Sequence, residues 1–304
     1  MTVCTLIDDG NPCGEGPIWD ATQQCLYWTD CSGKFFRYDW KTRQREIALN
    51  NFEVTGCALD HSGGFTFINS GGVWFWNRRD KPSLIMSDIG GIKLQLNDCI
   101  ADPEGRLLAG SCFYNPQAKY SLGKLFCVQT NGTVQILDEG IHLANGLGFS
   151  PDRRILYFTD SVARVIYAYD YDATTGRVKN RRAFVKVPGS SGLPDGLTVD
   201  AQGFVWSAEW YGSCICRYDP DGKLERRIPV PAKQTSSLAF GGPEMNDIFV
   251  TSAAKSEPMP VMPAGYNPES GYFGGGLFHL NAGITGTVEH RTKFRHLITR
   301  QASL

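Results

Sequence analysis

Six oxygen-bearing side chains recur along the chain at nearly even intervals, each at the start of a short apolar segment. They are Glu15, Thr55, Asn97, Asn145, Asp195 and Ser236. Successive members are 40, 42, 48, 50 and 41 residues apart. Carboxylate and carboxamide oxygens gathered at one point suit a hard divalent cation and suit a structural zinc site poorly, because the latter prefers thiolate and imidazole. Together, Glu15, Asn145 and Asp195 would neutralise a dication and leave positions open for water and substrate.

Each of these residues opens a segment of the same layout, and the layout predicts the elements that position them. An alternating apolar strand is followed by a turn such as DHSGG (60–64) or DPEG (102–105), and then by a second and a third strand. Repeats of about 40 residues built from short strands rich in β-branched and aromatic residues are typical of propeller blades. We therefore predict an all-β fold, a six-bladed β-propeller with four-stranded antiparallel blades around a central channel. The inner strands would bring the six residues, hereafter the anchor residues, to one mouth of that channel.

The composition is consistent with one such domain spanning residues 1–304. The sequence contains 34 glycines and 12% aromatic residues, and only 20% of its residues are charged, which disfavours a helical bundle. A formal net charge of -1 gives no electrostatic reason to expect a nucleic acid or a membrane surface as partner. The N-terminus lacks the basic and apolar regions of a signal peptide, and the ten cysteines follow no disulfide framework. We expect a cytoplasmic protein with free thiols, in which Cys214 and Cys216 pack rather than bridge.

A simpler interpretation of the anchor residues is that they cap strand ends and hydrate the channel. Four longer segments favour the metal site instead: GEGPIWD (14–20), ANGLGFSPD (144–152), LPDGLTVDAQGFVW (193–206) and GGGLFHL (274–280). Over residues 12–281 the chain resembles the SMP-30/gluconolactonase/LRE-like family, the senescence marker protein and sugar-lactonase group.

The resemblance implies a six-bladed propeller with one catalytic divalent metal in its channel. The family's metal ligands map onto Glu15, Asn145 and Asp195, and its further metal- or substrate-contacting Asn maps onto Asn97. The cation is left open among Ca, Mg, Mn, Fe and Zn. One position departs from the pattern, because Gln95 stands where sugar-lactonase members carry an arginine that helps hold substrate hydroxyls. Gln lacks the charge and the five-donor fork of Arg, which weakens the assignment of gluconolactone as substrate.

The predicted chemistry is hydrolysis of a lactone. A dication can polarise the carbonyl and stabilise the oxyanion that forms when water attacks. Asp195 is the predicted general base, acting by positioning a water molecule, and Asn97 would donate a hydrogen bond to the substrate. No Ser-His-Asp arrangement is evident, and among the five histidines only His142, three residues before Asn145, approaches the mouth.

Strand direction predicts that the connection between the second and third strands of each blade opens beside the metal. Two of these connections are long, at 112–123 and 253–276, and long loops at a catalytic face commonly shape binding. Candidate substrate contacts on such exits, together with Asn97 and Gln95, are Tyr114, Lys119, Tyr120, Trp210 and Tyr211. Lys119 would supply the missing positive charge.

The two ends of the chain and the function leave alternatives open. The segments at 3–7 and 286–294 are candidates for pairing across the ring junction, and the tail from Phe294 either frays or packs on the rim. The preferred function is a metal-dependent lactonase acting on a small sugar-derived aldonolactone. The alternatives are a hydrolase of a non-sugar lactone or other ester, and a non-catalytic propeller that keeps the metal as structure.

Overall fold

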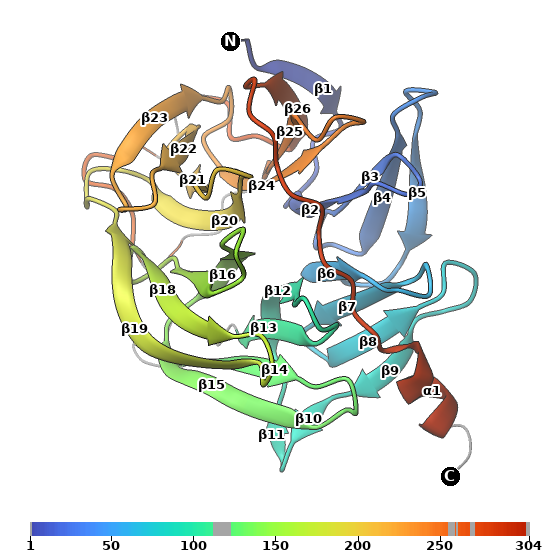
Figure 1. Cartoon of the computed structure of the whole chain (residues 1–304). Coiled ribbons are helices and arrows are strands. Elements are labelled where there is room, and N and C mark those ends of the chain that lie inside the picture. The colour runs from blue at the N-terminus through green and yellow to red at the C-terminus, as the bar shows by residue number, and fades with distance from the viewer. Residues whose placement is uncertain (1, 112–122, 255–258, 260, 268–270, 302–304) are drawn as a thin grey trace.

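A ring of six four-stranded antiparallel sheets forms the molecule (Figure 1). The computed structural model describes residues 2–111, 123–254, 259, 261–267 and 271–301. Each inner strand contacts the inner strand of the next blade, and the last contacts the first, so the ring is closed. The predicted six-bladed β-propeller is confirmed.

The blades follow one another in chain order, with each inner strand given first. Blade one holds β2 (Glu15–Asp20), β3 (Cys25–Thr29), β4 (Lys34–Asp39) and β5 (Arg45–Asn50). Blade two holds β6 (Gly56–Leu59), β7 (Phe65–Asn69), β8 (Gly72–Trp76) and β9 (Ser83–Met86). Blade three holds β12 (Leu96–Ala101), β13 (Leu107–Ser111), β14 (Gly123–Val128) and β15 (Val134–Ile141).

Blade four holds β16 (Ala144–Phe149), β17 (Ile155–Asp160), β18 (Val165–Asp172) and β19 (Arg177–Lys186). Blade five holds β20 (Leu193–Val199), β21 (Val205–Trp210), β22 (Cys214–Tyr218) and β23 (Leu224–Pro229). Blade six holds β24 (Thr235–Gly241), β25 (Asp247–Ser252), β26 (Gly276–Asn281) and β1 (Cys4–Asp8). A small hairpin, β10 (Asp88–Ile89) with β11 (Ile92–Lys93), and helix α1 (Arg295–Gln301) complete the set.

The turn from the first to the second strand has the construction that its sequence predicts. In blade two, the Asp60 carboxylate accepts a hydrogen bond from the Ser62 amide at 2.8 Å, and Gly63 has a φ of +87°. Glycine adopts this left-handed conformation without the steric cost of a Cβ atom. The turns at 102–105 and 200–203 repeat the arrangement, with an Asp at the start and a left-handed Gly at the end.

Apolar clusters between neighbouring blades form the core. Between blades one and two, Phe35, Phe65, Phe67 and Trp76 are all buried, and the rings of Phe35 and Phe67 lie 4.9 Å apart in an edge-to-face contact. Large aromatic side chains fill the wedge between two twisted sheets with few rotatable bonds. The aromatic residues of the sequence therefore hold the blades against one another.

The ring is closed by the N-terminal strand, as predicted for residues 3–7. β1 pairs antiparallel with β26 and supplies the outer strand of blade six. The expectation that 286–294 would also pair across this junction is wrong, because β1 already occupies the free edge of β26. That segment instead forms only isolated bridges, Gly286 with Asp200 and Thr292 with Asp60.

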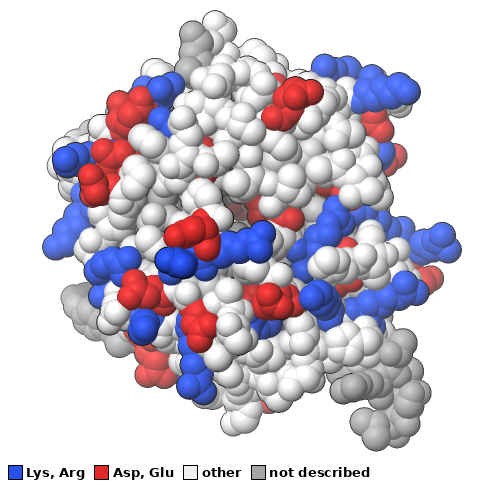
Figure 2. Space-filling model, in the orientation of Figure 1, with Lys and Arg blue, Asp and Glu red and all other residues white. Residues whose placement is uncertain are grey.

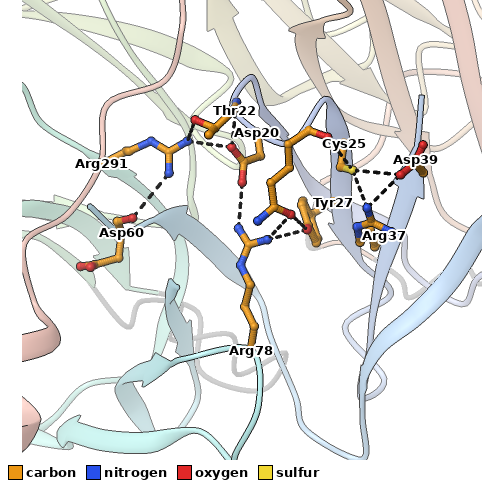
Figure 3. Close-up of polar contacts among 10 residues, drawn as sticks. Asp20, Thr22, Cys25, Tyr27, Arg37, Asp39, Asp60, Arg78 and Arg291 are labelled. Atoms are coloured by element: carbon orange, nitrogen blue, oxygen red, sulfur yellow. Dashed lines mark hydrogen bonds and ion pairs between the residues drawn. The ribbon is translucent and has the colours of Figure 1, made fainter. Parts of the chain in front are cut away.

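The segment 284–294, hereafter the C-terminal strap, crosses the ring at the end of the channel opposite the anchor residues (Figure 1). Its hydrogen bonds, ion pair and ring contact reach a residue of every blade, namely Asp20, Asp60, Gly105, Phe149, Asp200 and Met245. Figure 3 shows Arg291 of the strap pointing to Asp20, with Arg291 Nη2 2.7 Å from Asp20 Oδ1. The other carboxylate oxygen of Asp20, Oδ2, lies 2.8 Å from Arg78 Nη2. Phe294 at the end of the strap and Leu297 in α1 are buried against blades two and three, so the start of the tail packs on the rim.

Other features agree with the sequence analysis over the described part of the chain. The nine described cysteines are free, and the buried Cys214 and Cys216 sulfurs lie 4.0 Å apart. No helix among the described residues has the length and apolar character needed to cross a bilayer. On the face shown in Figure 2, Lys and Arg side chains are interspersed with Asp and Glu, as the net charge of -1 predicts.

Candidate metal and substrate site

Five of the six anchor residues line a single cavity of about 490 Å³ at one mouth of the channel. They are Glu15, Thr55, Asn97, Asn145 and Asp195. The sixth, Ser236, is fully buried, and its hydroxyl donates to the carbonyl oxygen of Gly14 at 2.5 Å. Ser236 therefore fixes the backbone next to Glu15 instead of facing the cavity.

β-bulges orient the anchor side chains. In five of the six inner strands the pairing with the second strand shifts register at the anchor residue, between Glu15 and Ile18 in β2 and between Asn145 and Leu147 in β16, for example. A bulge places two residues opposite one and turns a side chain away from its regular direction. The irregularity shared by β2, β12, β16 and β20 thus accompanies chemically different side chains that line the channel mouth.

Glu15 and Asp195 form the charged centre of the cavity. Burial, followed by the nearby Asp195 carboxylate, raises the pKa of Glu15 well above its ordinary value. Burial, followed by other acidic groups, likewise raises the pKa of Asp195. Asp195 is only 5% exposed, and its Oδ1 has no hydrogen-bond partner among the described residues. Two buried carboxyl groups without a counter-charge are the arrangement that a bound cation would stabilise.

The two amides are held in a defined orientation. Ser161 Oγ accepts a hydrogen bond from Asn145 Nδ2 at 2.8 Å, so Asn145 directs its Oδ1 to the other side. Asn97 Nδ2 donates both to this Oδ1 at 2.7 Å and to the carbonyl oxygen of Ala144 at 2.8 Å. Both amide hydrogens of Asn97 are thereby used, and the group it offers to the cavity is its Oδ1 rather than the donor expected from the sequence.

The donor set fits a hard divalent cation. Carboxylate oxygens of Glu15 and Asp195 and the carbonyl oxygen of Asn145 are the ligand types that such cations prefer. Among the described residues, no three His, Cys, Asp or Glu side chains converge on a possible metal position, so the third protein ligand here would be an amide. The unpartnered Asp195 Oδ1 is the observation that favours a cation at this place.

Several residues that line the cavity were not identified from the sequence. Asp98 follows Asn97 and faces the cavity because the β12 bulge interrupts the alternation; burial raises its pKa to about 7. Asp30, Glu53 and Cys31 reach the cavity from the ends of strands and from turns. For Asp30 a signal was available, since it directly follows Thr29, which pairs with Glu15.

The other predicted substrate contacts have different outcomes. Trp210 lines the cavity, is 8% exposed, and has an Nε1 without a hydrogen-bond partner. Gln95 is exposed just before β12 and is not among the residues that line the cavity. The candidates Tyr114, Lys119 and Tyr120 lie outside the described residues.

The connection at 253–276 does reach the site. Met259 lines the cavity, and its backbone N–H donates to Tyr211 Oη at 3.3 Å. Tyr211 is buried and packs on Tyr266, with ring centroids 4.4 Å apart, so it supports this wall from behind. His142 does not line the cavity, and its Nδ1 lies 3.1 Å from the buried Asp160 carboxylate.

Comparisons with known proteins identify the family of this chain. The family model described as "SMP-30/Gluconolactonase/LRE-like region" matches residues 13–254. Pentonolactonase XacC of Haloferax volcanii is 37% identical over 301 residues, which is 97% of this chain and 99% of that protein. Among solved structures, a luciferin-regenerating enzyme has a TM-score of 0.85 at 26% identity and covers 96% of this chain and 99% of its own. A calcium-binding protein, regucalcin from Agrobacterium tumefaciens, has a TM-score of 0.81 at 25% identity and covers 96% of both chains. The chain belongs to the SMP-30/gluconolactonase/LRE-like family.

Proposed function

We propose that this protein is a divalent-metal-dependent hydrolase that opens the ring of a sugar-derived aldonolactone. The observation that carries the proposal is the pair of buried carboxyl groups, Glu15 and Asp195, with an unpartnered Asp195 oxygen inside a cavity open to a small molecule. The similarity to a pentonolactonase over nearly the full length of both chains supports the same reaction class. The similarity to a calcium-binding regucalcin supports a divalent cation.

Each residue of the site has a distinct part in this proposal. A bound dication would polarise the lactone carbonyl and offset the charge that develops on its oxygen. Glu15 and Asn145 hold the cation, and Ser161 keeps the Asn145 oxygen directed at it. Asp195 orients the attacking water and accepts its proton, which is the positioning role expected of a carboxylate beside a cation. Asn97 accepts a hydrogen bond from a substrate hydroxyl through its Oδ1.

The walls of the cavity contribute orientation. Trp210, Leu143 and Met259 contribute apolar surface to the cavity, and the anchor residues contribute polar surface. The buried Trp210 indole N–H has no hydrogen-bond acceptor among the described residues, and a substrate oxygen that reaches this wall would supply one. A compact lactone, with one apolar ring face and several hydroxyls, matches such a cavity.

A lactone panel tests the proposal. Protein stripped with EDTA is supplied in turn with Ca²⁺, Mg²⁺, Mn²⁺, Fe²⁺ or Zn²⁺, and proton release from pentono- and hexonolactones is followed with a pH indicator. We expect turnover that depends on added metal and that falls at least about 1,000-fold in Asp195→Asn. The exposed Glu244→Gln variant serves as the control for loss of one acidic group.

Each outcome decides between the candidate functions. A rate of proton release that is the same with and without EDTA would contradict the metal mechanism. Hydrolysis of simple lactones or esters but not of sugar lactones would assign a different substrate, in agreement with the exposed Gln95. No turnover of any lactone by the metal-loaded protein would favour a non-catalytic binding propeller.

A further inference from the structure

Five carboxylic side chains line the cavity, and no Lys, Arg or His is found among its described lining residues. They are Glu15, Asp30, Glu53, Asp98 and Asp195. Over the described part of the chain, none of the five forms an ion pair with a basic side chain. Asp30 is fully buried, and its Oδ2 has no hydrogen-bond partner in the described part of the chain.

Glu53 holds the outermost of these charges. It is exposed, it precedes the inner strand of blade two, and its Oε2 accepts a hydrogen bond from Ser70 Oγ at 2.7 Å. A carboxylate fixed at the rim acts on every molecule that enters or leaves. Because the cavity wall has a low dielectric constant, its effect extends further than that of a charge on a flat surface.

The excess of negative charge persists when a dication is bound. Glu15 and Asp195 together balance a charge of +2, which leaves Asp30, Glu53 and Asp98 uncompensated. Counted over the described lining residues, the metal-loaded cavity therefore carries a net negative charge toward a solute that approaches its rim.

The reaction changes the charge of its ligand. A lactone is uncharged; adding one water breaks the acyl–oxygen bond and yields a hydroxy acid, which at neutral pH is a carboxylate plus a released proton. We propose that Asp30, Glu53 and Asp98 make the cavity selective for uncharged lactones and lower its affinity for the carboxylate product. Glu53, at the rim, sets this preference. The inference rests on the proposed function and adds a specificity role that the metal ligands cannot supply.

Acidic groups also line the channel toward its opposite end, so the repulsion of the carboxylate product is not confined to the rim. The C-terminal strap crosses that end, and its Glu289 lines the same inner chamber as Asp98. Burial and the Asp98 carboxylate raise the pKa of Glu289 to about 7. Asp98 and Glu289 thus place two carboxyl groups deeper in the channel than the rim, so a carboxylate product that moved inward would approach further acidic groups.

Glu53→Gln and Glu53→Lys test the proposal against Glu46→Gln. Glu46 is also a surface carboxylate, but it lies on β5 and pairs with Arg37, so its variant matches the change in net charge without touching the cavity. Binding of aldonate to metal-loaded protein is measured by calorimetry at low and at 0.5 M salt. Turnover is measured in parallel for a neutral lactone and for the same lactone carrying a phosphate.

We expect the Glu53 variants to bind aldonate more tightly than wild type, and we expect high salt to reduce this difference. Glu53→Gln should tighten aldonate binding about fivefold at low salt and Glu53→Lys more than tenfold, while 0.5 M salt reduces both effects to less than about twofold. The ratio of kcat/KM for the phosphorylated over the neutral lactone should rise in the same order. Glu46→Gln should leave both quantities at the wild-type value.

Two results would overturn the proposal. Equal aldonate affinity in wild type and both Glu53 variants at low salt would show that the rim charge does not act on the product. The same increase in Glu46→Gln would show a general effect of net charge. Because calorimetry needs no turnover, an inactive protein would contradict the proposed lactonase function without deciding this point.

Discussion

Glu209 offers a direct test of how the propeller tolerates a buried charge beside its candidate site. This residue precedes Trp210 in β21, is fully buried, and has an Oε2 without a hydrogen-bond partner. Burial raises the pKa of its carboxyl from 4.5 to about 8. The folded protein therefore keeps this proton over a pH range in which the unfolded chain has released it.

The sign and size of the effect follow from linkage. Between about pH 4.5 and pH 8 the folded state binds more protons than the unfolded state, so the free energy of unfolding falls as pH rises. The loss is complete only above pH 8, and at about 1.4 kcal/mol per pH unit it is on the order of 5 kcal/mol. Glu209→Gln keeps the shape of the side chain and removes the titration, so the variant should not show this loss.

Urea unfolding of wild type and Glu209→Gln at pH 5, 7 and 9, in EDTA throughout, measures the effect. Asp98 and Glu289, each with a pKa raised to about 7, titrate in both proteins and cancel in the difference. We expect Glu209→Gln to gain on wild type by several kcal/mol between pH 5 and pH 9. Free energies of unfolding that keep a constant difference between the two proteins over this range would refute the raised pKa of the buried Glu209 carboxyl.

Two further substitutions test the site and the closure of the channel. Ser161→Ala removes the acceptor that orients the Asn145 amide; we expect a 10- to 100-fold weaker metal affinity by calorimetry, and an unchanged affinity would contradict the orienting role. Arg291→Ala removes one of two arginines from the buried Asp20, whose pKa is lowered by these arginines against the effect of burial. It should cost about 2 kcal/mol in urea unfolding at pH 7, and that cost should shrink as pH falls below about 4; a cost that stays constant with pH would contradict the ion-pair explanation.

The blade repeat and the anchor residues could be predicted because they follow from local chemistry. The turn built by Asp60 and Gly63 recurs at 102–105 and 200–203, and the interval of 40 to 50 residues between successive anchor residues places Glu15, Asn145 and Asp195 at equivalent positions in their blades. The anchor position is also where inner strands bulge, so polar side chains there cost no core packing.

The presence of the remaining residues at the site depends on three-dimensional geometry that the spacing of residues along the sequence does not reveal. Alternation places Asp98 on the face opposite Asn97, and only the register shift in β12 brings both to the cavity. Glu53 and Cys31 come from connections whose paths depend on tertiary contacts, such as the hydrogen bond from Ser70 to Glu53. The path of the strap was likewise not predictable, since its contacts with Asp60 and Asp200 join residues more than 80 positions apart in the chain.

The strap and the cavity give the symmetric ring two chemically different ends. At the anchor end, bulges expose oxygen ligands, and the connection at 253–276 adds Met259 to the wall. At the other end the inner strands continue regularly into their turns, and the strap binds the Asp residues of those turns, as Phe294 N–H does with Asp60 at 2.8 Å. The turn carboxylates of Asp20 and Asp60 therefore shape their blades and also hold the strap, so the two ends of a ring built from six similar units differ in their chemistry.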